Sequence, residues 1–205
     1  MSKFKINSKY STIFFDWSGV IADDNGDEFI RQSLLDVGAT KTQITKILRK
    51  DFNDFMCGNL SEDEYWNILK NKYRLNIPNH YSGVFDKWKG IVPNNDMTAI
   101  LEEIKNKGIK ISLITNIIKP IFDIINELGY YDIFNDTIAS CEVNLIKPHP
   151  EIYELAIKRM GAKTKESIFI DDKQSNIDTA INMGFKTILA KNSQQICLEL
   201  RSIIK

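Results

Sequence analysis

The chain has 205 residues, and its 27 basic and 27 acidic side chains give a net charge of zero. This length allows one domain, or one domain with an insert, and the content of 43% hydrophobic and 26% charged residues is ordinary for a folded protein. The balanced charge, with no basic stretch, argues against nucleic acid as a partner. No apolar run approaches the roughly 20 residues that span a bilayer, so we expect no membrane partner.

Cysteine usage and the N-terminus both favour a cytoplasmic protein. Cys57, Cys141 and Cys197 are widely spaced and form no CxxC pair, which predicts three reduced thiols. The first ten residues are polar and lack the apolar segment of a signal peptide. The sequence carries no signal of the oligomeric state.

The first part of the chain predicts one strand followed by a helical stretch. An apolar run predicts a buried strand over 12–16. From 22 to 88 the pattern is helical, and the spacing of apolar residues predicts helices over 27–37 and 42–55. A capping box predicts a further helix over 61–73. We interpret this stretch as an inserted helical module.

From residue 89 onward, predicted strands and helices alternate, which is typical of a parallel sheet covered by helices on both faces. Prolines at helix starts and glycines after helix ends indicate the boundaries. The predicted strands are 109–115, 136–140, 167–171 and 186–190, and the predicted helices are 97–107, 120–129, 150–160, 175–183 and 193–204.

Polar side chains stand where three of the predicted strands end. Asp16 ends the first strand, Thr115 and Asn116 end the next, and Asp171 and Asp172 end the strand that begins at residue 167. Open α/β sheets bind their ligands outside the carboxyl ends of the strands. We therefore expect these side chains to form one site.

Four motifs in this order resemble those of the haloacid dehalogenase-like hydrolase superfamily, whose members are mostly phosphatases. The likeness is greatest to the branch with a helical cap inserted after the first strand, and it covers nearly the full length. It implies an α/β fold, with a Rossmann-like parallel-sheet core formed by 1–21 and 89–205 and a small α-helical cap formed by 22–88. The motifs are Phe14-Phe15-Asp16-Trp17-Ser18-Gly19-Val20, Leu113-Ile114-Thr115-Asn116, Lys147-Pro148-His149-Pro150 and Phe169-Ile170-Asp171-Asp172.

The resemblance implies hydrolysis of a small phosphorylated substrate, with Mg²⁺ as the cofactor. Asp16 would attack the phosphorus and form an aspartyl-phosphate, which splits one difficult step into two. Asp16, Asp171 and Asp172 would supply carboxylates to the metal, because Mg²⁺ prefers oxygen ligands. The backbone carbonyl of Ser18 would be a further ligand.

Other residues of the motifs would handle the phosphate and its charge. The Thr115 hydroxyl and the Asn116 amide would hold phosphate oxygens. Lys147 would bind phosphate, offset the clustered negative charge and orient the nucleophile. Asn176 would support the ligands of the metal. The expected catalytic centre is thus Asp16, Ser18, Thr115 and Lys147.

Ser18 departs from the pattern of the superfamily. Most of its phosphatases carry Asp two residues after the nucleophile, where it protonates the leaving group and then activates water. A serine hydroxyl is too weak an acid for this at neutral pH, and loss of an acid–base group costs about 10²–10⁴-fold in rate. Three interpretations stay open: a substrate with a good leaving group such as an acyl phosphate, a proton donor elsewhere, for example in the cap, or a deliberately long-lived intermediate.

Two other functions also stay open. The segment Asp16-Trp17-Ser18-Gly19 is similar to the Asp-Trp-Ala-Gly of phosphonoacetaldehyde hydrolases, which cleave a carbon–phosphorus bond with a cap lysine. Lys46 or Lys50 would be candidates for that lysine. The third and fourth motifs are closer to those of phosphatases. The other alternative is a phosphate-binding or regulatory protein that has lost turnover.

Two segments of the insert have weaker predicted roles. Asp23, Asp24 and Asp27 are interpreted as the hinge into the cap and as a second, weaker candidate for metal binding. The segment 55–60 is predicted to be the cap loop that faces the site.

Overall fold

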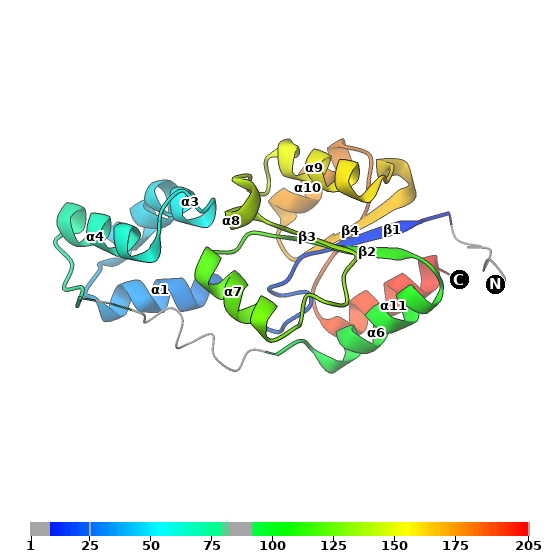
Figure 1. Cartoon of the computed structure of the whole chain (residues 1–205), viewed down its shortest axis with the longest axis horizontal. Coiled ribbons are helices and arrows are strands. Elements are labelled where there is room, and N and C mark those ends of the chain that lie inside the picture. The colour runs from blue at the N-terminus through cyan, green and yellow to red at the C-terminus, as the bar shows by residue number, and fades with distance from the viewer. Residues whose placement is uncertain (1–8, 25, 80, 82–91, 205) are drawn as a thin grey trace.

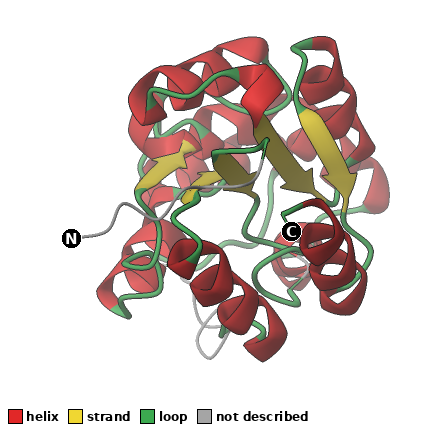
Figure 2. Ribbon diagram, turned by 90° about the vertical axis from the view of Figure 1, so that its right-hand side faces the viewer, coloured by secondary structure: helices red, strands yellow, loops and turns green. Residues whose placement is uncertain are grey.

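The computed structural model describes residues 9–24, 26–79, 81 and 92–204. Within them, five parallel strands form one sheet in the order β3-β2-β1-β4-β5, which confirms the predicted α/β fold (Figures 1 and 2). All of the predicted strands are present, with small shifts at their ends. They are β1 (Thr12–Phe15), β2 (Lys110–Thr115), β3 (Asp136–Ala139), β4 (Ser167–Asp171) and β5 (Lys186–Leu189).

The register of the sheet brings the predicted site residues to one edge. Phe15, the last residue of β1, pairs with Leu113 on one side and Ile170 on the other. The carboxyl ends of β1, β2 and β4 are therefore neighbours, and β1 stands at the centre of the sheet. This is the arrangement that the strand-end residues predicted.

Helices cover both faces of the sheet, as the alternation of elements predicted (Figure 1). Side chains alternate between the faces of a strand. In β1, Phe14 joins the apolar cluster that includes residues of α9 and α10, whereas Phe15 joins the cluster that includes residues of α6, α7 and α11. These helices are α6 (Asn95–Asn106), α7 (Lys119–Glu127), α9 (Pro150–Met160), α10 (Gln174–Asn182) and α11 (Ser193–Ile203).

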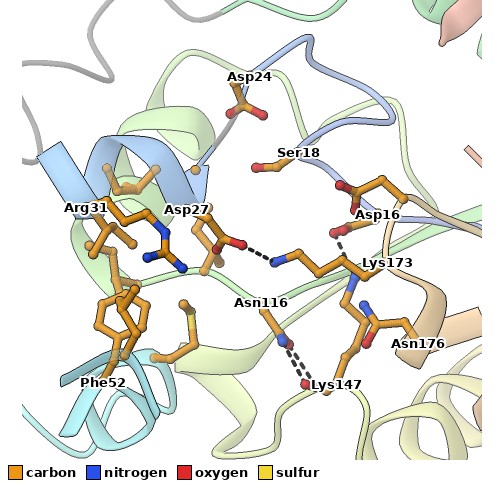
Figure 3. Close-up of a pocket in the computed structure, with 18 residues that line it drawn as sticks. Asp16, Ser18, Asp24, Asp27, Arg31, Phe52, Asn116, Lys147, Lys173 and Asn176 are labelled. Atoms are coloured by element: carbon orange, nitrogen blue, oxygen red, sulfur yellow. Dashed lines mark hydrogen bonds and ion pairs between the residues drawn. The ribbon is translucent and has the colours of Figure 1, made fainter. Parts of the chain in front are cut away.

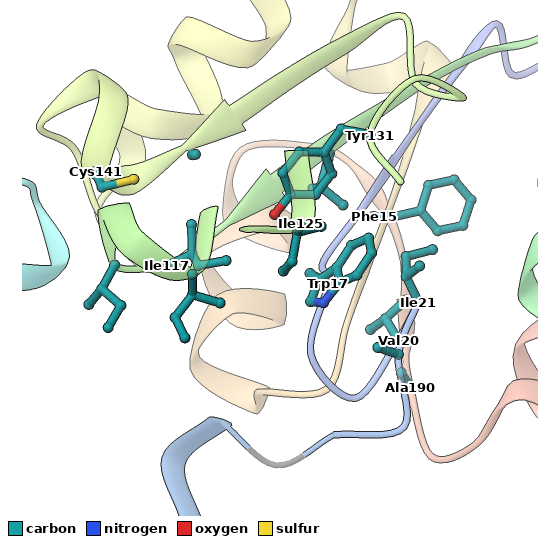
Figure 4. Close-up of a cluster of buried hydrophobic side chains, with 14 of the residues drawn as sticks. Phe15, Trp17, Val20, Ile21, Ile117, Ile125, Tyr131, Cys141 and Ala190 are labelled. Atoms are coloured by element: carbon teal, nitrogen blue, oxygen red, sulfur yellow. The ribbon is translucent and has the colours of Figure 1, made fainter. Parts of the chain in front are cut away.

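The turn after β1 is fixed by a buried tryptophan (Figure 4). Trp17 is fully buried, and its ring meets that of Tyr131 edge-on with the centroids 5.2 Å apart. Its carbonyl oxygen accepts the backbone N–H groups of Ile21 at 2.8 Å and Ala22 at 3.1 Å. The turn cannot rotate without opening this cluster, so the position of the preceding Asp16 is fixed as well.

A helical insert, residues 26–73, lies between β1 and β2 in the chain and beside the sheet in space (Figure 1). Capping boxes at Thr40 and Ser61 start two of its helices, the second as predicted. Its elements are α1 (Gly26–Asp36), α2 (Lys41–Lys46), the π-helical turn η1 (Ile47–Asp51), α3 (Phe52–Met56) and α4 (Glu62–Tyr73).

Two of the predicted elements contain an additional element in the structure. The single helix predicted over 42–55 is interrupted by the π-helical turn η1. The strand predicted over 136–140 ends one residue earlier and continues into the short helix α8 (Ser140–Val143). In both places the apolar pattern suits either conformation, so the pattern could not distinguish them. The short 3₁₀ helix η2 (Thr164–Glu166) was also not predicted.

The loop between α3 and α4 is fixed to α8. The Ser140 hydroxyl donates to the carbonyl oxygen of Met56 at 2.7 Å, and the Asn144 amide donates to the carbonyl oxygen of Cys57 at 2.9 Å. Gly58, with φ +73°, approaches so closely that a Cβ atom there would lie 2.2 Å from the carbonyl oxygen of Cys141. The insert is therefore attached to the sheet edge as well as to β1.

Other predictions concern single features. The thiols of Cys57, Cys141 and Cys197 are free. In the part of the chain that the structure describes, no helix combines the length and the apolar character needed to cross a bilayer. The predicted boundary at 88/89 lies outside the described residues.

Candidate active site

A cavity of about 440 Å³ lies between the carboxyl ends of the strands and the helical insert (Figure 3). Both parts of the chain contribute to its wall. The core lines one end with polar side chains, among them Asp16, Ser18, Asn116, Lys147 and Asp172. These are five of the seven residues that the sequence predicted for the site.

Asp16 and Lys147 form an ion pair at the base of the cavity. Lys147 Nζ lies 2.8 Å from Asp16 Oδ1, and the Lys147 side chain is 1% exposed. The backbone N–H of Trp17 donates to the same Oδ1 at 2.7 Å. Both the ion pair and this hydrogen bond are made by Oδ1, and no hydrogen bond or ion pair joins Oδ2 to a described residue. One carboxylate oxygen is thus held in place while the other stays available.

Asp171 is fully buried behind this pair, and its two oxygens are already occupied. Its Oδ2 accepts Lys147 Nζ at 2.7 Å. Its Oδ1 accepts the backbone N–H of Lys173 and the side-chain amide of Asn176, both at 2.8 Å. Asp171 therefore anchors Lys147, and Asn176 anchors Asp171.

Charge and burial compete at this centre. Burial raises the pKa of Asp16 to about 7; Lys147 opposes this increase, and Asp171 adds to it. Burial also acts to lower the pKa of Lys147, but the adjacent Asp16 and Asp171 outweigh it and leave that pKa above its usual value. Burial, followed by the charge of Asp171, raises the pKa of Asp172. The lysine is charged, and more carboxylates surround it than it can neutralise.

Asp16, Asp171 and Asp172 offer carboxylate oxygens that all lie within 4.8 Å of one another. They are the one group of three such ligands found in the described part of the chain. Gly19 makes room for them, because a Cβ atom at this position would lie 2.9 Å from Asp172 Oδ2. Oxygen donors at this spacing suit a hard cation such as Mg²⁺. The acids 23, 24 and 27 do not form a second group.

Asn116 and Thr115 were expected to hold phosphate oxygens, but one is bonded to the backbone and the other lies off the cavity wall. The Asn116 side chain donates to the carbonyl oxygen of Lys147 at 2.9 Å and accepts the Lys147 N–H at 2.8 Å. It thus fixes the backbone of the lysine that holds Asp16. Thr115 is buried and does not belong to the cavity wall. Phosphate binding by either side chain stays a prediction.

The sequence profile of the haloacid dehalogenase-like hydrolases matches residues 10–184. The chain belongs to this family of hydrolases. It is 28% identical over 198 residues to the sesquiterpene phosphatase of Aspergillus oryzae, in an alignment that covers 95% of this chain and 97% of the relative.

Solved structures of the family share the fold. A HAD-like family hydrolase from Porphyromonas gingivalis has a TM-score of 0.77 and 25% identity, covering 95% of this chain and 99% of its own. A HAD family enzyme from Bacteroides thetaiotaomicron, crystallised with magnesium and inorganic phosphate, has a TM-score of 0.67 and 18% identity, covering 89% and 94%. At this identity the second likeness shows the fold.

In this member of the family, position 18 holds a serine where most of the phosphatases have an acid, but another acid lies next to it. Asp24 lines the cavity, and in the view of Figure 3 Ser18 lies between Asp24 and Asp16. Both carboxylate oxygens of Asp24 are buried, and neither forms a hydrogen bond of normal geometry with a described residue. Burial raises the pKa of Asp24 to about 6, against the opposing effect of the nearby Ser18 hydroxyl. From the sequence, Asp24 was expected in the hinge into the cap or as a weaker candidate for metal binding, with no part in proton transfer.

The two neighbouring acids are engaged elsewhere. Asp23 accepts a hydrogen bond from the Asn94 side chain. Asp27, at the start of α1, pairs with Lys173 Nζ of the core at 3.0 Å. This ion pair joins the insert to the core at the rim of the cavity. The hinge role predicted for these acids is therefore compatible with their contacts.

The insert contributes few of the residues that the sequence analysis singled out. Neither Lys46 nor Lys50 belongs to the cavity wall, so the lysine required for carbon–phosphorus cleavage is not where that hypothesis placed it. Of the segment 55–60, Met56 lines the cavity, while Cys57 and the following residues contact α8.

Proposed function

We propose that this hydrolase is a Mg²⁺-dependent phosphatase that acts on a small phosphorylated metabolite through an aspartyl-phosphate on Asp16. The observation that carries the proposal is the Asp16 carboxylate itself. It lies on the cavity wall with Oδ1 held by Lys147 and by the Trp17 N–H. A nucleophile needs this combination of fixed orientation and one accessible oxygen.

The comparisons support the phosphatase branch. The sesquiterpene phosphatase aligns over nearly the whole of both chains. The enzyme of Bacteroides thetaiotaomicron shares the fold, and it binds magnesium and inorganic phosphate. Both favour phosphoryl transfer over the other chemistries of this family.

The residues at the base of the cavity suit Mg²⁺. We propose that Asp16 and Asp172 hold it, with the backbone carbonyl of Ser18 as a further ligand. Asp171 is the least available of the three acids, because its oxygens already accept hydrogen bonds from Lys147, Lys173 and Asn176. When bound, the cation would neutralise negative charge on the phosphoryl group and on the acids around it.

The reaction would then proceed in two steps. A carboxylate oxygen of Asp16 attacks phosphorus, the ester P–O bond breaks, and the alcohol leaves with a proton. Water next attacks the phosphorus of the aspartyl-phosphate, which releases inorganic phosphate and restores the carboxylate. Lys147, held by Asp171 and by Asn116, stays charged beside Asp16 throughout and offsets the negative charge on the phosphoryl oxygens.

Asp24 is the proposed source of the proton that Ser18 does not supply. It lines the cavity together with Ser18, whose hydroxyl lies close enough to act on its pKa, and neither of its buried oxygens has a hydrogen-bond partner of normal geometry among the described residues. It would give its proton to the leaving alcohol and take one from the attacking water. This is the second of the three interpretations of Ser18, with the donor at the hinge of the insert.

The insert is the proposed cap. In this division, residues 1–21 and 89–205 form the catalytic core and residues 22–88 form a cap that covers the strand ends. The Asp27–Lys173 ion pair and the contacts of Met56 and Cys57 with α8 support it, because they hold the insert over the cavity. Such a cover would exclude water from the phosphoryl group.

The test is phosphate release from a panel of phosphate monoesters and acyl phosphates, with Mg²⁺ and with EDTA, by the wild type and by Asp16→Asn. We expect turnover that requires the metal, and a loss on the order of 10⁴-fold or more in the variant. Release that survives in Asp16→Asn would refute the nucleophile. Absence of release from every compound would leave a phosphate-binding protein as the better proposal.

A further inference from the structure

The wall of the cavity changes character along its length. The end formed by the core carries the charged residues described above. The insert and the segment 117–121 supply the apolar part of the wall, and in the view of Figure 3 Phe52 of the insert lies on the side of the cavity away from Asp16, with Arg31 beside it. The apolar side chains are Ile30, Leu48, Phe52 and Met56 from the insert, and Ile117, Ile118 and Ile121 from the core.

The helical geometry of the insert aligns part of this wall. Leu48, Phe52 and Met56 follow one another at intervals of four residues, from η1 into α3. In a regular α-helix, with 3.6 residues per turn, such a series drifts around the axis. A π-helical turn holds more residues per turn, so a step of four residues through it drifts in the opposite direction and offsets the drift of the next step in α3. The interruption in the predicted helix thus helps to place three apolar side chains on one cavity.

Polar partners are scarce at this end. Residues 26–73 contribute two charged side chains to the wall, Asp27, which is paired with Lys173, and Arg31. The other side chains there have no hydrogen-bonding groups except the weakly accepting sulfur of Met56. A sugar or polyol would find only Arg31 and Asp27 as polar partners on this wall and would leave its remaining hydroxyl groups unpaired, which is costly in a buried site. A hydrocarbon group would instead bury apolar surface on both sides.

We propose that the substrate is a phosphate monoester of an apolar alcohol, whose hydrocarbon group lies along this wall while its phosphate lies at Asp16. The inference rests on the proposed phosphatase function and names its substrate class. The cavity volume of about 440 Å³ falls within the range of about 300–1,000 Å³ typical of small-molecule sites. The phosphate therefore leaves room for a hydrocarbon group.

The first experiment uses linear primary alkyl phosphates from ethyl to decyl, with glycerol 1-phosphate as the polar comparison. These leaving groups are all primary alcohols of similar basicity, so the hydrocarbon is the main difference. We expect kcat/KM for phosphate release, with Mg²⁺, to rise about two- to fourfold for each added methylene until the wall is filled. Equal values along the series, or a preference for glycerol 1-phosphate, would overturn the inference.

A second measurement separates this inference from the proposed reaction. Linear alkylphosphonates carry no ester bond, and their binding in the presence of Mg²⁺ can be followed by calorimetry. A Kd that falls with chain length supports the apolar site even if no ester is hydrolysed. A Kd independent of chain length overturns it even if acetyl phosphate is hydrolysed.

Variants locate the effect on the wall. Leu48→Gln and Met56→Gln place an amide beside the hydrocarbon, and both side chains are only partly buried, so the fold should tolerate them. We expect each to lower kcat/KM for decyl phosphate about tenfold and to leave acetyl phosphate nearly unchanged. The matched control is Leu35→Gln, an exposed position of α1 away from the cavity, which should change neither. Equal losses in the control would overturn the placement.

Discussion

The two ends of the cavity differ in where along the chain their residues come from. The polar end gathers residues from distant parts of the chain, because the carboxyl ends of β1, β2 and β4 are neighbours in the sheet. The apolar end comes mainly from one continuous stretch of the chain, the insert. The polar end holds charges that depend on one another, so that a change there affects stability and chemistry together. The apolar end holds independent side chains, so that a change there affects selectivity.

The largest effect is expected from Lys147→Met. It leaves Asp16 and Asp171 buried without their cation, and loss of one partner of a buried ion pair costs about 3–5 kcal/mol. We expect this loss in the free energy of unfolding measured with denaturant, together with loss of phosphate release. In the control, Lys163→Met, the exposed partner of Glu166 is removed, and the change should be below about 1 kcal/mol. Similar stability of the two variants would contradict a buried ion-pair cluster of Asp16, Lys147 and Asp171.

Asp24→Asn replaces the carboxyl group with an amide of nearly the same size, so it should lower the rate of phosphate release without disturbing the packing. If Asp24 supplies the proton, turnover of alkyl phosphates should fall about 10²–10⁴-fold. Acetyl phosphate has a good leaving group and needs little protonation, so its turnover should fall much less. The control is Asp23→Asn, whose side chain contacts Asn94 instead of Ser18. Equal losses with both substrates would argue against proton transfer by Asp24.

A smaller effect is expected from pH on the metal-free protein. The pKa of Asp16 is about 7 and that of Asp24 about 6 in the folded state, against about 4 for an unfolded Asp. The folded protein then binds more protons than the unfolded chain between pH 4 and 7, so its stability falls as the pH rises through this range.

Thermal unfolding in EDTA should therefore give a lower Tm at pH 8 than at pH 5.5, and Mg²⁺ should raise Tm more at pH 8. Asp16→Asn removes one of the shifted groups and should weaken this dependence. A Tm that rises between pH 5.5 and 8 in EDTA would contradict the predicted direction.

The smallest effect is expected from Asp27→Asn. The ion pair with Lys173 joins the insert to the core, but both side chains are about half exposed, at 58% and 49%. Such pairs contribute about 0–1 kcal/mol, so kcat/KM should change by less than about fivefold. The difference from wild type should also shrink at high salt, because salt screens exposed charges. A loss as large as that of Asp24→Asn would mean that the pair does more than hold the insert.

The sequence predicted the sheet and the polar end better than the apolar end. Continuous apolar runs mark buried parallel strands, and their polar ends must meet at one edge of the sheet. By contrast, the contact between Asn116 and Lys147 joins residues 31 positions apart, and no local pattern encodes it. The place of Asp24 depends on how the turn around Trp17 packs, and η1 has the same apolar spacing as a helix. These features are set by tertiary contacts.

The attachment of the α3–α4 loop to α8 has a consequence for exchanging segments between relatives. The insert is continuous in sequence, which suggests it could be replaced as a unit to change the substrate. Yet Met56 and Cys57 are hydrogen-bonded to Ser140 and Asn144, and Gly58 fits against Cys141. A chimera that replaces residues 26–73 alone would set a foreign loop against α8. One that also carries residues 140–144 from the same donor would keep the two surfaces matched.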